Sequence, residues 1–265
     1  MGEILGHQVF GAAAVIGEER AQELRGRMDG LGIAYDCAAP ERLAAYHALL
    51  EDWNERVNLT GDASFALALD RHYVDSIAPL ALEGLFPERA SLIDVGSGAG
   101  FPGLPLAIVR PDLQVTLLDS LNKRLAFLAA VVDALGLRNV RLVHARAEDG
   151  GRAAPHREQY DIAVARAVAP LPVLCELLLP FVRPGGSMLC YKGPAAAEEM
   201  AAGRRAALLL GGDAPRALPV RIPAQPDWRH CVLASQKIQR TARQYPRKAG
   251  TPSREPLGSF DTTQR

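Results

Sequence analysis

The stretch SLIDVGSGAGFP, residues 91–102, decides the fold of this 265-residue chain. Residues 91–95 form a short apolar run that is typical of a buried strand, and three glycines follow it at alternate positions. Glycine lets the backbone turn sharply and pass close to a ligand, because no Cβ intervenes. Pro102 suits the first turn of a helix. A strand, a glycine turn and a helix in this order are typical of a nucleotide-binding loop.

The glycine spacing separates this loop from the dinucleotide fingerprint. That fingerprint requires G-x-G-x-x-G, whereas here residue 101 is Phe and the third glycine comes one residue early. The spacing therefore favours a loop around a nucleoside over a loop that serves a pyrophosphate. Taken alone, the loop leaves a purely structural turn open as an alternative.

Short apolar runs alternate with helical segments on the carboxyl-terminal side of residue 91. This alternation predicts a mostly parallel sheet with helices on both faces, and ligands of such sheets bind at the carboxyl ends of the strands. The predicted strands are 91–95, 114–119, 139–143, 160–165 and 186–191, with two late extended segments near 216–222 and 228–235. The predicted helices are 102–109, 122–135, 170–180 and 195–210.

The residues before the glycine loop predict helices only. Within 41–58, apolar residues alternate steps of three and four, which indicates one amphipathic helix. Further helical stretches are predicted over 63–82 and 1–30. We therefore expect an N-terminal helical cap over 1–85, a nucleotide-binding α/β domain over 86–236 and a basic segment over 237–265.

The composition excludes several classes of protein. Apolar residues make up 48% of the chain, enough for a full core, yet no run approaches the roughly 18 apolar residues of a membrane span. The amino-terminal residues lack the early positive charge of a secretory signal. The four cysteines follow no metal-ligand spacing, so we expect reduced thiols and no metal site. These features predict a cytoplasmic protein.

Two carboxylates follow the second and third predicted strands. Asp119 ends the second strand, where it can bind both ribose hydroxyls of an adenosine or cap the next helix. After the third strand, groups around Ala147 and Glu148 could bind the adenine edge. Because neighbouring strand ends meet at one edge of a parallel sheet, the glycine loop and these carboxylates form one candidate site.

These motifs, with others along the chain, resemble the class I methyltransferases and, within them, the RsmG (GidB) family. The resemblance covers about residues 41–257. It is carried by WNERVNLT (53–60), RHYVDS (71–76), DVGSGAGFPGLPLAI (94–108), LLDSLNKRLAFL (117–128), RAE (146–148), ARAVAPL (165–171), KG (192–193) and YPRKAGTPSREPL (245–257).

The resemblance implies a class I, Rossmann-like fold with a seven-stranded sheet. It also implies transfer of a methyl group from S-adenosyl-L-methionine to N7 of a guanine, at position 527 of 16S ribosomal RNA. Together with the glycine loop, it places the cofactor contacts at Asp94, Gly96, Gly98, Phe101, Asp119, Ala147, Glu148 and Arg166.

The residues also bear on the reaction type. Amino-group methylation of adenine or cytosine commonly uses an (Asn/Asp)-Pro-Pro-aromatic loop after the fourth strand, which here reads ARAVAP. Cytosine C5 methylation commonly needs a Pro-Cys pair, and no cysteine here follows a proline. Methylation of guanine N7 requires neither of these features, because this nitrogen carries a lone pair and no proton. We therefore expect no general base, and alignment by Arg166 and Lys192.

A basic segment at 236–254 suggests contacts with RNA phosphates, and a frayed, solvated tail is the equal alternative on charge alone. The expected partner is 16S ribosomal RNA or the small ribosomal subunit, bound by a monomeric enzyme. Each candidate RNA contact also has a structural alternative, such as a helix cap or an exposed surface position. The candidates are Asn58, His72, Lys123, Arg124, Lys192, Arg247 and Lys248.

Three other functions remain open from the sequence. One is a class I methyltransferase with another RNA, a protein or a small-molecule substrate. Another is an NAD-dependent oxidoreductase, against which the glycine spacing argues. The third is a noncatalytic RNA-binding module that keeps the fold.

Overall fold

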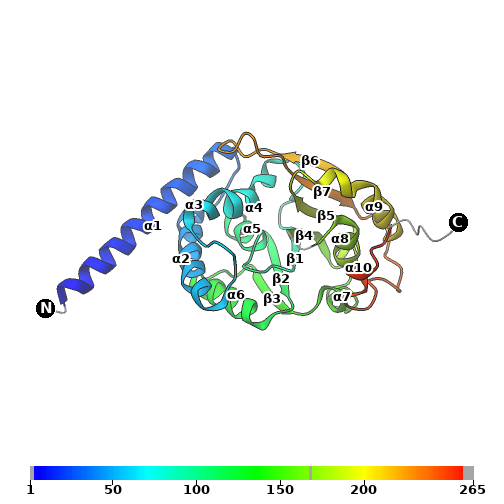
Figure 1. Ribbon diagram of the computed structural model, residues 1–265, viewed down its shortest axis with the longest axis horizontal. Coiled ribbons are helices and arrows are strands. Elements are labelled where there is room, and N and C mark those ends of the chain that lie inside the picture. Colours follow the sequence, from blue (N-terminus) through cyan, green and yellow to red (C-terminus); the bar gives the residue numbers. More distant parts are fainter. Residues whose placement is uncertain (1–2, 167–168, 259–265) are drawn as a thin grey trace.

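The computed structural model of the chain describes residues 3–166 and 169–258. Its centre is a seven-stranded sheet in the order β3-β2-β1-β4-β5-β7-β6, with helices on both faces (Figure 1). The strands are β1 (Ser91–Val95), β2 (Gln114–Asp119), β3 (Val140–His144), β4 (Tyr160–Arg166), β5 (Val182–Lys192), β6 (Arg216–Val220) and β7 (His230–Gln236).

The strand order reverses between β1 and β4. The chain passes from β1 through β2 to β3 on one side of the sheet, then returns to place β4 against β1. These strands and β5 pair in parallel, while β7 is antiparallel to both β5 and β6. The carboxyl ends of β1 and β4 therefore flank the point at which open α/β sheets bind ligands.

Alternating side chains of the strands bury both faces of the sheet. Leu92 of β1 belongs to a core cluster that includes Phe127, whereas its neighbour Ile93 belongs to a second cluster that includes Leu174. Successive side chains of a strand point to opposite faces, so one apolar run supplies both cores. The covering helices are α5 (Gly103–Val109), α6 (Asn122–Ala134), α7 (Ala147–Gly150), α8 (Leu171–Leu178), α9 (Ala196–Leu209) and α10 (Thr251–Arg254).

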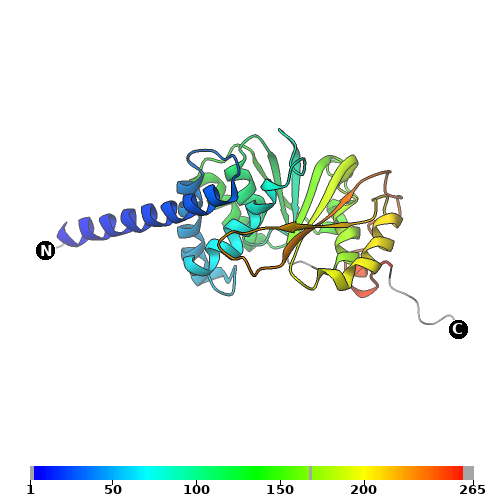
Figure 2. The same cartoon turned by 90° about the horizontal axis from the view of Figure 1, so that it is seen from above.

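The N-terminal helices pack on the face covered by α5 and α6. Leu43, Tyr46 and Leu50 of α2 are fully buried in the same core cluster as β1. Helix α1 extends well away from the rest of the molecule (Figures 1 and 2). The elements before the sheet are α1 (Glu3–Leu31), α2 (Ala39–Val57), α3 (Phe65–Ala68), the π-helical η1 (Leu69–Val74), α4 (Asp75–Ile77) and the 3₁₀-helical η2 (Ala78–Ala81). The expected boundary near residue 85 stays a prediction.

The predicted elements agree with the structure to different degrees. The first two strands have the predicted bounds, and the other strands begin or end within a few residues of theirs. The helical stretch predicted over 63–82 is a series of four short elements rather than one regular helix. Pro79 lies in the last of them, where it cannot donate an α-helical hydrogen bond.

Candidate active site

A cavity of about 550 Å³ opens at the carboxyl ends of β1 to β4. Its walls are the glycine loop, the residues that follow β2 and β3, and Arg166 at the end of β4. The walls also include Leu59 and Thr60 after α2, His72 of η1, Leu177 of α8 and Ser253 of α10. A larger groove of about 960 Å³ runs between α1 and α2. We assign the site to the smaller cavity, because it lies at the reversal of strand order and collects the predicted residues.

The glycine loop needs its glycines for two physical reasons. Gly96 and Gly98 have φ angles of 78° and 58°, in the left-handed region that side chains disfavour. At Gly100, with φ of 102°, a Cβ would lie 2.6 Å from Cδ1 of Leu104 and 2.7 Å from the hydroxyl oxygen of Tyr46. The loop thus passes close to α2 and α5 while its other side faces the cavity.

Asp94, near the end of β1, stabilises the glycine loop from the protein interior and is fully buried. Its Oδ2 accepts a hydrogen bond from the amide of Gly103 at 2.9 Å, which fixes the start of α5. Burial raises the pKa of this carboxyl to about 7, against the opposing effect of that hydrogen bond. Asp94 lies behind the loop rather than on the cavity wall, so its contact with the cofactor stays a prediction.

Asp119 joins the glycine loop to α6. Its Oδ2 accepts a hydrogen bond from the amide of Gly98 and its Oδ1 one from the amide of Leu121, each at 2.9 Å. Arg124 lies 3.4 Å from the same Oδ2. Asp119 therefore stabilises the turn before α6, but it does not cap the helix, because the N-cap residue is Leu121 and no side chain accepts a capping hydrogen bond there. Oδ2 thus accepts from both Gly98 and Arg124, while Oδ1 keeps a second lone pair that can accept a hydrogen bond from a ribose hydroxyl.

Replacing Asp119 by Asn is expected to weaken binding of S-adenosylhomocysteine at least about tenfold, because two charge-assisted hydrogen bonds become neutral or are lost. Isothermal titration calorimetry measures this. Asp133→Asn, at an exposed position of α6, is the matched control and should bind like the wild type. Equal affinities for both variants would remove Asp119 from the cofactor site.

Ala147 and Glu148 begin α7 and lie on the cavity wall. The Glu148 side chain is held in place, because its Oε1 accepts a hydrogen bond from the amide of Gly250 at 2.8 Å. Only 8% of Glu148 is exposed. The structure thus brings the two carboxylates predicted after β2 and β3 to one cavity.

Arg166 closes the cavity at the end of β4. Its Nη1 donates to the carbonyl oxygen of Arg71 at 3.0 Å and lies 3.2 Å from Oδ2 of Asp75. Its guanidinium carbon lies 5.0 Å from the centre of the Phe101 ring, within the range of a cation–π contact. The His72 ring approaches the same phenyl ring, with centroids 4.9 Å apart. The next two residues, 167–168 of the ARAVAPL motif, lie outside the described residues.

Partial burial and the nearby Arg166 charge lower the pKa of His72 from 6.5 to about 4. Between these values the unfolded state binds more protons than the folded state, so the free energy of unfolding rises with pH. Asp94 makes the free energy of unfolding fall with rising pH between pH 3.8 and about 7, because its pKa is raised in the folded state.

The His72→Gln variant should therefore lose less stability than the wild type when the pH falls from about 7 to about 5. Urea unfolding of both proteins at the two pH values isolates this difference, since the contribution of Asp94 is common to both. Parallel pH dependences would show that His72 does not titrate with a lowered pKa.

Several predicted site residues do not line the cavity. The Lys192 amine lies 2.8 Å from the Glu199 carboxylate and donates to the carbonyl oxygen of Ala169. Arg247 forms an ion pair of 2.7 Å with the buried Glu176. These contacts give both cations structural partners, and their contacts with RNA stay predictions.

Three other candidates lie on the surface. Asn58 is exposed and ends α2 in the left-handed conformation, and Lys123 is exposed with its amine 3.5 Å from the carbonyl oxygen of Val57. Lys248 is exposed in the C-terminal segment. Their RNA contacts also stay predictions.

Sequence reasoning missed part of the site. The hydroxyl of Tyr46 donates to the carbonyl oxygen of Ala99 and so ties α2 to the glycine loop. Arg146 is exposed on the cavity wall beside Ala147, and Ser253 reaches the cavity from the C-terminal segment. The position of Arg146 directly after the third strand could have indicated it. No local pattern in the sequence indicates Ser253.

The residues that line the cavity fit the expected cofactor. Asp119 and Glu148 offer acceptors to a ribose and to an adenine amine, and a Cβ at Gly98 would have only the carbonyl oxygen of Gly96 near it, at 3.9 Å. The loop therefore leaves room for a nucleoside. Within the described ranges no helix is long and apolar enough to cross a bilayer, and no group of ligands could hold a metal ion.

Among α/β proteins, a crevice that offers strand-end carboxylates to an adenosine, with this glycine spacing, is typical of class I methyltransferases, and this chain is one of them. Its cofactor is S-adenosyl-L-methionine. The chain belongs to the GidB family, described as rRNA small subunit methyltransferase G, whose model matches residues 39–219.

Named relatives agree with this family, and a solved structure shares the fold. The chain is 45% identical over 227 residues to ribosomal RNA small subunit methyltransferase G of Alkaliphilus metalliredigens, covering 86% of this chain and 94% of the relative. It is 44% identical over 217 residues to the protein of that name from Clostridium beijerinckii, covering 82% and 90%. A chain from a complex that contains the Haloferax volcanii Trm112 methyltransferase activator shares the fold, with a TM-score of 0.51, 13% identity and coverage of 73% and 98%.

Proposed function

We propose that this protein transfers a methyl group from S-adenosyl-L-methionine to N7 of a specific guanine in 16S ribosomal RNA. The observation that carries the proposal is the family match over residues 39–219, together with relatives named ribosomal RNA small subunit methyltransferase G. The substrate is the RNA alone or the small ribosomal subunit, and the enzyme acts as a cytoplasmic monomer.

The two buried cysteines, Cys175 and Cys190, are unsuited to act as a thiolate nucleophile. Burial raises the pKa of the Cys190 thiol to about 12 and that of Cys175 well above its usual value. Neither side chain therefore supplies a thiolate at neutral pH. Guanine N7 attacks through its own lone pair, so the reaction does not require one.

The task of the protein in this mechanism is alignment. Bound S-adenosyl-L-methionine supplies an electrophilic methyl group on a sulfonium sulfur. Asp119 and Glu148 would hold the adenosine end of the cofactor, and Arg166 would act as a clamp on its methionine carboxylate or on the guanine. Correct alignment of reacting groups can lower a barrier by roughly 7–11 kcal/mol. His72 stays uncharged at neutral pH, since its pKa is about 4. An uncharged ring beside Phe101 suits an aromatic base better than a second cation next to Arg166.

Basic side chains near the cavity suit the RNA backbone. Arg124 and Arg146 lie on the cavity wall, and Lys123 and Lys248 are exposed. We propose that these four cations contact phosphates and position the RNA, while the target guanine enters the cavity.

Mapping of N7-methylguanosine in ribosomal RNA from cells with and without the gene tests the proposal. One N7-methylguanosine of 16S ribosomal RNA should disappear without the gene and return when it is restored. An unchanged map would contradict the substrate and leave the fold and the cofactor standing.

A further inference from the structure

The C-terminal segment is held against the rest of the protein by an ion pair between the partly exposed Arg247 and a buried carboxylate. The Arg247 guanidinium and backbone amide both donate to the carboxylate of Glu176, at distances from 2.7 to 3.1 Å. Glu176 lies in α8 and is fully buried. Its neighbour Leu177 lines the cofactor cavity. The residue predicted to bind phosphates is thus bound internally, next to the cavity wall.

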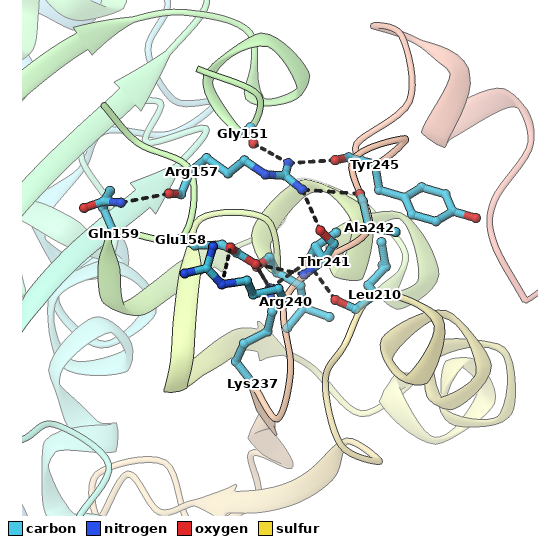
Figure 3. Close-up of polar contacts among 11 residues, drawn as sticks. Gly151, Arg157, Glu158, Gln159, Leu210, Lys237, Arg240, Thr241, Ala242 and Tyr245 are labelled. Atoms are coloured by element: carbon cyan, nitrogen blue, oxygen red, sulfur yellow. Dashed lines mark hydrogen bonds and ion pairs between the residues drawn. The ribbon is translucent and has the colours of Figure 1, made fainter. Parts of the chain in front are cut away.

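Arg157 makes a second connection, between the C-terminal segment and α7 (Figure 3). Its Nη1 donates to the carbonyl oxygens of Gly151 at 3.0 Å and Tyr245 at 2.7 Å. Its Nη2 donates to the carbonyl oxygen of Thr241 at 2.8 Å. Gly151 follows the last turn of α7, the helix that begins with Ala147 and Glu148. One guanidinium therefore links the cofactor-binding turn to the C-terminal chain.

The neighbouring side chains fix the start of the same segment (Figure 3). Glu158 accepts a hydrogen bond from the amide of Thr241 at 2.8 Å. The Lys237 amine, on a side chain that is fully buried, donates to the Thr241 hydroxyl and lies 3.6 Å from the Glu158 carboxylate. Buried and satisfied polar contacts of this kind give a segment one defined position.

The far end of the segment reaches the cofactor cavity itself. The Gly250 amide donates to Oε1 of Glu148, and Ser253 is part of the cavity wall. The carbonyl oxygen of Pro246 accepts a hydrogen bond from Arg152, just beyond α7, at 2.7 Å. The hydrogen bond from Gly250 occupies one carboxylate oxygen of Glu148 and leaves the second for a donor in the cavity.

We propose that residues 237–253, here called the strap, form a wall of the cofactor site and position Glu148 to accept a hydrogen bond from the adenine amine. This inference rests on the assignment of the cavity to S-adenosyl-L-methionine. The inference gives the strap a role in cofactor affinity and adenine selectivity. The positive charge of the segment alone suggested only contacts with RNA phosphates. The positioning residues are Arg157, Arg247 and Gly250.

The first test uses the unmodified protein and relies on the thermodynamic linkage between cofactor binding and ordering of the strap. If the ordered strap raises the affinity for the cofactor by a certain factor, the bound cofactor must shift the strap toward its ordered state by the same factor. Hydrogen exchange of the full chain should therefore slow about tenfold in peptides that contain the Gly250 amide when S-adenosylhomocysteine saturates the site. Peptides from α9 should exchange at an unchanged rate. Unchanged exchange at Gly250 would overturn the inference.

The second test uses Arg157→Gln with Arg243→Gln, an exposed arginine of the strap, as the matched control. Arg157→Gln should bind S-adenosylhomocysteine about tenfold more weakly, and the control should bind like the wild type. The wild type should prefer S-adenosylhomocysteine to S-inosylhomocysteine, which lacks the adenine amine, and Arg157→Gln should lose much of that preference. A general loss of packing would weaken both ligands equally.

Three outcomes distinguish a failure of the strap proposal from a failure of the cofactor assignment on which it rests. If Arg157→Gln keeps full affinity and selectivity for S-adenosylhomocysteine, the strap does not position Glu148. The same holds if only its affinity for RNA falls. If the wild type itself does not bind S-adenosylhomocysteine, the assignment of the cavity fails and the inference falls with it.

Discussion

Replacing Arg247 by Ala is expected to lower the free energy of unfolding by about 3 kcal/mol, because it leaves a buried carboxylate without its partner. Glu176 is fully buried and receives both the guanidinium and the backbone amide of Arg247. An uncompensated charge in the interior costs far more than the pair contributes when intact. Urea unfolding at neutral pH measures the loss.

The neighbouring Lys248 provides the control for this experiment. It carries the same charge and is exposed, so Lys248→Ala should change the stability by no more than about 0.5 kcal/mol. A second variant, Arg247→Leu combined with Glu176→Leu, should recover much of the loss, since it removes the buried charge as well. If Arg247→Ala is as stable as Lys248→Ala, the ion pair does not hold the strap in solution.

Replacing Arg166 by Lys is expected to lower kcat/KM for methyl transfer about 100-fold, the effect of a misplacement of about 1 Å at a reacting centre. The guanidinium is planar, contacts Asp75 and the carbonyl oxygen of Arg71, and lies over the Phe101 ring. A lysine keeps the charge and cannot reproduce that combination. Steady-state methylation of small-subunit particles provides the measurement.

Arg183→Lys is the matched control for Arg166→Lys. Arg183 also pairs with an aspartate, Asp161, and it lies near the start of β5, away from the cavity. Its replacement should leave kcat/KM within about twofold of the wild type, as expected for an exposed ion pair. Full activity of the Arg166→Lys enzyme would contradict the clamping role of Arg166.

The parts that could be predicted from the sequence are those set by local patterns. Strands β1 and β2 have the predicted bounds, because each is a short apolar run that ends at a polar residue or a glycine. The glycine loop and Asp119 meet as expected, since the carboxyl ends of adjacent parallel strands lie at one edge of the sheet. Arg166 reaches the same cavity for the same reason.

The parts that could not be predicted depend on contacts between distant residues. Glu148 and Gly250 are 102 positions apart, and Arg247 and Glu176 are 71 apart. In the sequence Arg247 is one of several cations in a basic segment, so charge alone suggests phosphate contacts. Only the fold shows that a buried carboxylate of α8 binds it. The contact of Lys192 with Glu199 spans only seven positions, but it joins the end of a strand to the following helix and so matches no periodic spacing.

The ends of β1, β2 and β3 are expected to bind one adenosyl group beside Arg166. A crystal structure of the full chain with S-adenosylhomocysteine provides the decisive measurement. The ribose hydroxyls should contact Asp119, the adenine should lie against Ala147 and Glu148, and the thioether sulfur should point toward Arg166 and Phe101. A ligand bound elsewhere, or one that approaches Asp119 with its adenine instead of its ribose, would exclude this assignment of the cofactor site.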